Sequence, residues 1–244
     1  IASVKKQIKE YKVGGVCFFQ GSPKKQAILA QEYQKIANIP LLTAIDGEWG
    51  LGMRFPKQAI SFPKQLTIGA VDDHQLIYRM GREIGRQCQA SGINVNFAPV
   101  VDVNNNAANP VINVRSFGED RENVSRKGIL YMRGMQDAGL LTTAKHFPGH
   151  GDTDKDSHLA LPVINHDRKR LDDIEDLVDS TDFHIVHDFV TQTGLELCVN
   201  PYWSDVMQPS NWRPGKISFS ERGGCSWWCY GASHRHVWNS IQNT

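Results

Sequence analysis

Short apolar runs alternate with longer amphipathic stretches along the first 144 residues. The apolar runs are bounded by turn residues and have strand length, which predicts strands at 13–19, 39–45, 93–103 and 139–144. Apolar residues three or four apart predict helices at 24–37, 73–90 and 124–137. Strands that alternate with helices in this way predict a parallel sheet and an α/β fold.

The helix predicted at 73–90 has the clearest amphipathic pattern. We expect Asp72 or Asp73 to cap its start, and the helix to stop before Gly92. Its expected buried face consists of Leu76, Ile77, Met80, Ile84 and Cys88. The first helix has a similar face, formed by Ala27, Leu29, Ala30 and Tyr33.

Charged residues recur where the predicted strands end, which favours a TIM-type (β/α) barrel. We therefore predict one barrel domain over residues 1–244. About four strand–helix units can be read from the pattern, whereas a closed eight-stranded barrel typically uses about 250 residues. We expect the barrel to be incomplete or irregular in its C-terminal part.

The composition changes near the C-terminus. Residues 209–244 form an atypical tail without helical or strand periodicity. Beyond residue 197 the chain holds five of its six tryptophans, at positions 203, 212, 227, 228 and 238. Our hypothesis is that this tail is translated out of frame, which intact-mass measurement and resequencing of the coding DNA would test.

Composition limits the classes of partner. A formal net charge of +1 and the lack of a basic patch argue against nucleic-acid binding. We expect no membrane span, because no apolar run approaches about 18 residues. The chain opens on Ile1 inside a charged segment, so we expect a processed or truncated start. Both a periplasmic or secreted location and a cytoplasmic one remain open, as does the oligomeric state. Cys17 and Cys88 fit buried free thiols.

Ionisable residues are concentrated in residues 145–158, directly after the last predicted strand, with three histidines and three aspartates. Asp156 stands two residues before His158, and a carboxylate beside an imidazole can move protons near neutral pH. A solvated loop is the alternative. The spacing of the aspartates resembles a calcium loop, but Ser157 and Val163 replace the glycine and glutamate that such a loop requires.

Other predicted strand ends add to this group. Asp46 and Glu48 follow the second strand, Asp102 ends the third, and Arg54 and Arg115 come soon after. With Trp49 and Phe147 as apolar surfaces, these groups suit a polyhydroxylated ligand. The alternative for Arg115 and Asp120 is a structural salt bridge that holds the asparagine-rich loop.

Four motifs together resemble the N-terminal domain of glycoside hydrolase family 3, and within it the β-N-acetylglucosaminidase branch. They lie at 46–54, 96–103, 109–118 and 145–158. Residues 1–176 are family-like and 177–208 match in part. The resemblance implies a TIM-type barrel and retaining hydrolysis of terminal β-linked N-acetylglucosamine, including sugars from peptidoglycan turnover.

The resemblance also implies roles for single residues. His158 would be the proton donor with Asp156 as its partner, and Asp205 in 203–207 would be the nucleophile. The implied substrate-binding residues are Asp46, Arg54, Arg115, Lys145 and His146. No cofactor and no metal are expected.

Four alternatives stay open at this point. The chain is an active exo-glycosidase, or a truncated, inactive barrel that binds amino sugar. A β-glucosidase is disfavoured by the pair of Asp156 and His158. A zinc site is conceivable at Cys225, Cys229, His234 and His236.

Overall fold

The structure is a computed structural model, and it describes residues 1–146, 149–156 and 170. Contacts divide the chain into two units, and the sheet and helices that carry the candidate site belong to the unit Lys5–Val178. The chain begins with α1 (Ala2–Lys6), which continues as the π-helical turn η1 (Gln7–Tyr11). Within the described residues, no helix combines the length and apolarity needed to cross a membrane.

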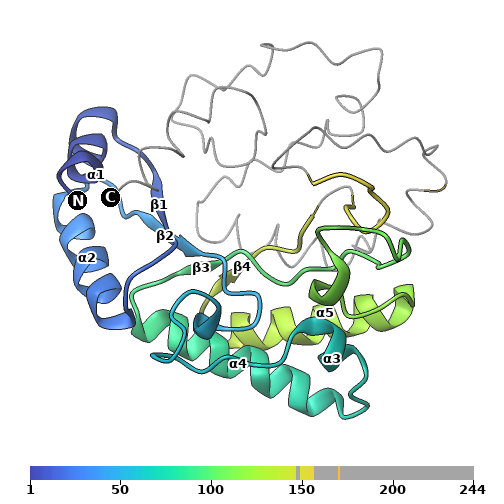
Figure 1. Ribbon diagram of the computed structural model, residues 1–244. Helices are drawn as coiled ribbons and strands as arrows, with labels where there is room; N and C mark the ends of the chain where they lie inside the picture. Colours follow the sequence, from blue (N-terminus) through green and yellow to red (C-terminus); the bar gives the residue numbers. More distant parts are fainter. Residues whose placement is uncertain (147–148, 157–169, 171–244) are drawn as a thin grey trace. The chain divides into compact units, whose positions relative to one another are not determined.

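Four parallel strands form one sheet in the order β1-β2-β3-β4 (Figure 1). They are β1 (Gly15–Phe18), β2 (Leu42–Ile45), β3 (Val95–Asn96) and β4 (Leu141–Thr142). The helices α2 (Pro23–Ile36), α4 (His74–Ala90) and α5 (Arg121–Asp137) connect consecutive strands and lie on one side of the sheet (Figure 1). The predicted α/β class and the TIM-type order of strands and helices are confirmed.

Local sequence explains where these helices begin. Ser22 caps α2 by accepting a hydrogen bond from the Lys25 amide, and Pro23 fills the first turn, where no amide proton is needed. Asp73, one of the two predicted caps, accepts from the Gln75 amide at the start of α4. Asp120 likewise accepts from the Asn123 amide at the start of α5.

The helices α4 and α5 cross with their backbones close together. An added Cβ on Gly81 would overlap the carbonyl oxygen of Tyr131, and one on Gly134 would overlap that of Tyr78. Tyr131 and Ile84 are fully buried in the core beside this crossing. The close approach lets the helix pair cover the sheet and fixes where β3 and β4 begin.

Two sequence predictions need correction. Leu76 is not on the buried face of α4: it is 49% exposed and lines a groove with Phe62 and Val71. The predicted third strand also shrinks from 93–103 to Val95–Asn96. Pro99 has no amide proton to donate, and beyond β3 only Val100 and Lys145 form a bridge. The carbonyls of Ala98 and Pro99 still accept from the amides of Thr143 and Lys145.

Short elements connect the strand ends to the helices. The 3-10 turn η2 (Leu51–Met53) and the short helix α3 (Gln65–Gly69) follow β2, and the 3-10 turn η3 (Asn113–Arg115) follows β3. The carboxyl ends of parallel strands lie at the same edge of a sheet, so the residues after β2, β3 and β4 come together. The five predicted substrate-binding residues follow these strand ends.

Candidate active site

Lys145 joins the residues that follow β2 to those that follow β4. Its Nζ lies 2.9 Å from Asp46 Oδ1 and 2.7 Å from Glu48 Oε1. Asp46 also pairs through Oδ2 with Arg54 Nη2, at 3.0 Å. The Arg54 guanidinium lies 5.2 Å from the ring centre of Phe19, the residue after β1. Four charged groups and one ring from three strand ends are thus in contact.

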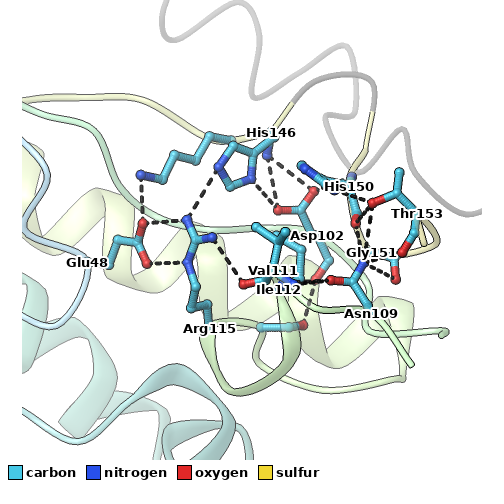
Figure 2. A network of polar contacts seen from close by, with 12 residues as sticks. Glu48, Asp102, Asn109, Val111, Ile112, Arg115, His146, His150, Gly151 and Thr153 are labelled. Atoms are coloured by element: carbon cyan, nitrogen blue, oxygen red, sulfur yellow. Dashed lines mark hydrogen bonds and ion pairs between the residues drawn. The ribbon is translucent and has the colours of Figure 1, made fainter. Parts of the chain in front are cut away.

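Glu48 and Arg115 form a two-pronged ion pair in the middle of this group (Figure 2). Arg115 donates from Nε to Oε2 at 2.9 Å and from Nη2 to Oε1 at 2.7 Å. The Glu48 side chain is 1% exposed, and burial by itself would raise its pKa. The hydrogen bonds from Arg115 and the charges of Lys145 and Arg115 outweigh burial and lower that pKa to about 2.

The turn that carries Glu48 is fixed by neutral side chains that form hydrogen bonds to its backbone. Gln65 Nε2 and the Tyr131 hydroxyl donate to the Glu48 carbonyl, at 2.5 and 3.0 Å. Asn96 on β3 accepts from the Gly47 amide and donates to the Gly47 carbonyl. The carboxylate is therefore held by its backbone as well as by its ionic partners.

Asp102 organises the residues after β4. Its side chain is fully buried and accepts from His146 Nδ1 at 2.6 Å and from the His150 amide at 2.7 Å. It accepts from the His146 amide as well, so one carboxylate ties residues 146 and 150 together. An ionised carboxylate only accepts, which assigns the ring proton to Nδ1 and leaves Nε2 as an acceptor toward Arg115 Nη2, 3.4 Å away.

The five predicted substrate-binding residues, here called the strand-end clamp, therefore lie in one connected network. They are Asp46, Arg54, Arg115, Lys145 and His146. Asp156 is described, at the end of the segment 149–156. His158 and Asp205 lie outside the described residues, as do Phe147 and the cysteines and histidines of the conceivable zinc site. Trp49 is partly exposed, with Lys64 Nζ 5.2 Å from the centre of its ring.

Glu48 and Asp102 were predicted only as charges at strand ends, and neither was among the predicted catalytic or substrate-binding residues. In the structure they are the carboxylates that hold Arg115 and His146 in place.

The alternative of a structural salt bridge holds for Arg115, with Glu48 as its partner, whereas the structure gives Asp120 a different role. Arg115 pairs with Glu48, and Asp120 caps helix α5. A carboxylate at a helix start is satisfied by backbone amides and has no need of a cation. Among the described residues, no group of three or more His, Cys, Asp or Glu is arranged to hold a metal ion.

The free thiols Cys17 and Cys88 lie outside this network. Cys88 is buried as predicted, whereas the side chain of Cys17 is only partly buried. Burial raises the pKa of each thiol to about 12. Both are protonated at neutral pH and are poor nucleophiles.

Comparison with known proteins places the chain in a family. The model of the glycosyl hydrolase family 3 N-terminal domain matches residues 2–179. Beta-hexosaminidase A of Pseudoalteromonas piscicida is 41% identical over 176 residues, which are 67% of this chain and 29% of that protein. The beta-N-acetylglucosaminidase/beta-glucosidase of Cellulomonas fimi is 34% identical over 161 residues, covering 66% of this chain and 28% of that one.

A solved structure of the same family is similar to this chain in both fold and sequence. The family 3 β-N-acetylglucosaminidase from Paenibacillus sp. str. FPU-7 superposes with a TM-score of 0.69 and 46% identity, over 72% of this chain and 35% of that chain. The chain belongs to glycoside hydrolase family 3, in which it matches the N-terminal domain. It spans about a third of the length of each of these three proteins.

Proposed function

We propose that the chain is the catalytic domain of a retaining exo-glycosidase that hydrolyses terminal β-linked N-acetylglucosamine from glycans or peptidoglycan fragments. The observation that carries the proposal is a two-layered arrangement of charge at the strand ends. Glu48 and Asp102 form a back layer, with side chains 1% and 0% exposed. The strand-end clamp lies in front of them, with side chains between 9% and 30% exposed.

This layering suits sugar recognition. The buried back layer fixes the clamp, while the exposed edges of the clamp offer donors from Arg54, Arg115 and Lys145 and an acceptor from Asp46. Hydrogen bonds from charged groups are roughly twice as strong as neutral ones, and a ring with several hydroxyls needs many of them in fixed directions. Holding the ring in one orientation converts binding energy into rate.

The proposed chemistry uses one carboxylate as the nucleophile and one aspartate–histidine pair as the acid and base. Asp205 attacks the anomeric carbon to give a covalent glycosyl-enzyme, while His158, supported by Asp156, protonates the leaving oxygen. The bond to the aglycone breaks as the bond to Asp205 forms. The same histidine then removes a proton from water, whose oxygen attacks the anomeric carbon and displaces the Asp205 carboxylate, so the sugar leaves with its original configuration.

Turnover of 4-nitrophenyl N-acetyl-β-glucosaminide tests this proposal, with calorimetric binding of N-acetylglucosamine measured in parallel. We expect both nitrophenol release and binding. Binding without release would instead select the alternative of an inactive amino-sugar-binding barrel. Arg115→Ala should lower kcat/KM by about 100-fold. Its matched control is Arg86→Ala on the exposed face of α4, which should leave the rate unchanged.

The nucleophile is tested separately. Asp205→Ala should abolish release of the sugar, since no glycosyl-enzyme can form. Azide added as an external nucleophile should restore part of the rate and yield the inverted glycosyl azide. Undiminished turnover by the variant would remove Asp205 from the mechanism.

A β-glucosidase is the competing specificity, because the Cellulomonas fimi relative carries both activities in its name. A comparison of kcat/KM for the aryl glucoside and the aryl N-acetylglucosaminide separates the two. We expect the N-acetylglucosaminide to react faster. Equal rates would show that the acetamido group is not recognised.

A further inference from the structure

The segment 149–156 carries Asp156 and meets the strand-end clamp at the ring of His146. The His146 and His150 rings meet edge to face, with centroids 5.8 Å apart. Asp102 accepts from the His150 amide, and a second buried side chain outside the clamp contacts the rest of the turn. Asn109, 2% exposed, lies between the segment and the loop that leads into Arg115 (Figure 2).

The two ends of the Asn109 carboxamide face different parts of the site. Nδ2 lies 2.6 Å from the His150 carbonyl oxygen, 3.1 Å from that of Gly151 and 3.0 Å from that of Thr153. A primary amide has two protons, so these three carbonyls share them. The carbonyl oxygens of one turn are thus gathered around a single donor.

The other end of the carboxamide organises the Arg115 loop. Asn109 Oδ1 accepts from the amides of Val111 and Ile112, at 2.8 and 2.7 Å. The carbonyl of Val111 in turn accepts from Arg115 Nη1 at 3.2 Å. One side chain therefore sets both the turn before Asp156 and the loop that delivers a clamp residue.

Further contacts keep this segment in one position. The Thr153 hydroxyl donates to the His150 carbonyl at 3.1 Å and receives a hydrogen bond from His150 Nδ1. Gly151 is seated directly on the backbone of residue 103, so that an added Cβ would overlap the Val103 carbonyl oxygen. The segment has little room to shift without losing the Asn109 contacts.

We propose that Asn109 is a positioning residue of the reaction: its amide nitrogen holds the segment 149–156, and with it Asp156 of the proposed proton-transferring pair, in register with Arg115. This inference rests on the proposed function. A loop that carries a proton donor is useful only at one distance from the bond to be broken, because proton transfer needs hydrogen-bond contact. Asn109 supplies that fixed distance through contacts to both sides of the site.

Asn109→Asp tests the inference, because it changes one end of the side chain and keeps the other. The carboxylate still accepts from Val111 and Ile112, but it replaces the donor with a charged acceptor that the three carbonyls repel. Asn38→Asp is the matched control, since Asn38 is exposed and precedes β2, at the opposite end of the strands.

The first readout is independent of activity. Lys155 is exposed within the segment, so a lysine-specific protease reports how readily the segment opens under native conditions. Cleavage after Lys155 should become about 10-fold faster in Asn109→Asp, while cleavage after the exposed Lys57 should stay unchanged. Unchanged cleavage at Lys155 would overturn the inference whether or not the chain is an enzyme.

The second readout links the position of the segment to proton donation. Asn109→Asp should lower kcat about 10–100-fold for an aryl glycoside with a poor leaving group, which needs the acid. A 2,4-dinitrophenyl glycoside leaves without protonation, so its glycosylation rate should stay within about twofold. Equal losses on both substrates would mean general damage to the site and would contradict the inference. If the unaltered protein does not turn over either substrate, the result would instead count against the proposed function.

Thr153→Val is a second variant in case Asn109→Asp does not fold. It removes the hydroxyl that forms hydrogen bonds with His150 and keeps the shape of the side chain. The same pattern is expected, with a smaller effect of about 3–10-fold on both Lys155 cleavage and the poor leaving group. If neither quantity changes, the segment is held by something other than this turn.

Discussion

The strand-end clamp and the segment 149–156 are positioned by different forces, although they lie next to each other. Full charges hold the clamp: Glu48 and Asp46 face Arg115, Lys145 and Arg54 across three strand ends. In the segment, neutral hydrogen bonds and close backbone packing dominate, through Asn109 and Gly151. Two contacts to charged groups accompany them: Asp102 accepts from the His150 amide, and Arg170 pairs with Asp152.

The difference follows from what each part has to do. A clamp that binds a sugar must present charged groups, and its buried carboxylates are stable only because cations face them. In the proposed function the segment carries the proton-transferring Asp156, and its turn must be held without a further charge beside that residue. A neutral carboxamide meets that need. Perturbing the two regions should therefore give effects of different size and of different dependence on pH.

The largest effect is expected from removing the central carboxylate. Glu48→Ala leaves Arg115 and Lys145 without their shared partner in a buried place, which should cost about 3–5 kcal/mol of unfolding free energy. Urea denaturation measures it. Glu83→Ala is the control, because it breaks an exposed pair with Arg86 on α4 and should cost less than about 1 kcal/mol. Similar costs would mean that burial adds nothing to the clamp.

The second effect is a pH dependence of stability. The Glu48 pKa falls from 4.5 to about 2 on folding, so its contribution is present above pH 4.5 and is lost as the pH falls toward 2. The loss should approach about 3 kcal/mol. Urea unfolding at several pH values between 2 and 6 measures it, and Glu48→Gln should flatten the slope. A slope unaltered by that substitution would assign the acid sensitivity to other groups.

The third effect concerns the segment. Gly151→Ala should force the turn away from Val103 and cost about 1–3 kcal/mol. Unlike the loss from Glu48, this loss should be independent of pH, because no ionisable group changes. Gly14→Ala is the matched control, with no atom within 4 Å of the added Cβ. Equal stability of the two variants would show that the segment can move freely.

The smallest effect lies outside both regions. Asp73→Ala removes the cap of α4 and should cost about 1 kcal/mol. Since α4 lies on one side of the sheet and the site at the strand ends, kcat and KM should stay unchanged. A changed kcat would indicate that the helix layer influences the site.

Much of the fold could be predicted from local sequence. The amphipathic pattern found α2, α4 and α5 to within three residues at each end, because capping and burial act over one or two turns. The strands were found less well. β3 is far shorter than its apolar run, since Pro99 interrupts pairing that depends on neighbours distant in sequence.

The sequence predicted which residues form the strand-end clamp, but not which of them contact each other. Charges at strand ends identified Asp46, Arg54 and Arg115, and the ionisable stretch after the last strand contained Lys145 and His146. The family resemblance gave all five their binding role. Which carboxylate faces which cation depends on strand register, and Glu48 and Lys145 lie 2.7 Å apart although 97 positions separate them in the sequence. Asn109 was part of a motif, yet nothing local shows that its amide would reach residues 150–153.

The sequence by itself determined the α/β class, the helix starts, the family and the residue types gathered at the strand ends, because these depend on periodicity, caps and short motifs. Only the tertiary structure decided that Glu48 and Asp102 form a buried back layer behind the strand-end clamp. It alone brought Asn109 between Arg115 and the segment 149–156. Parallel strand pairing is the physical reason, since it joins residues far apart in the chain at one edge of a sheet.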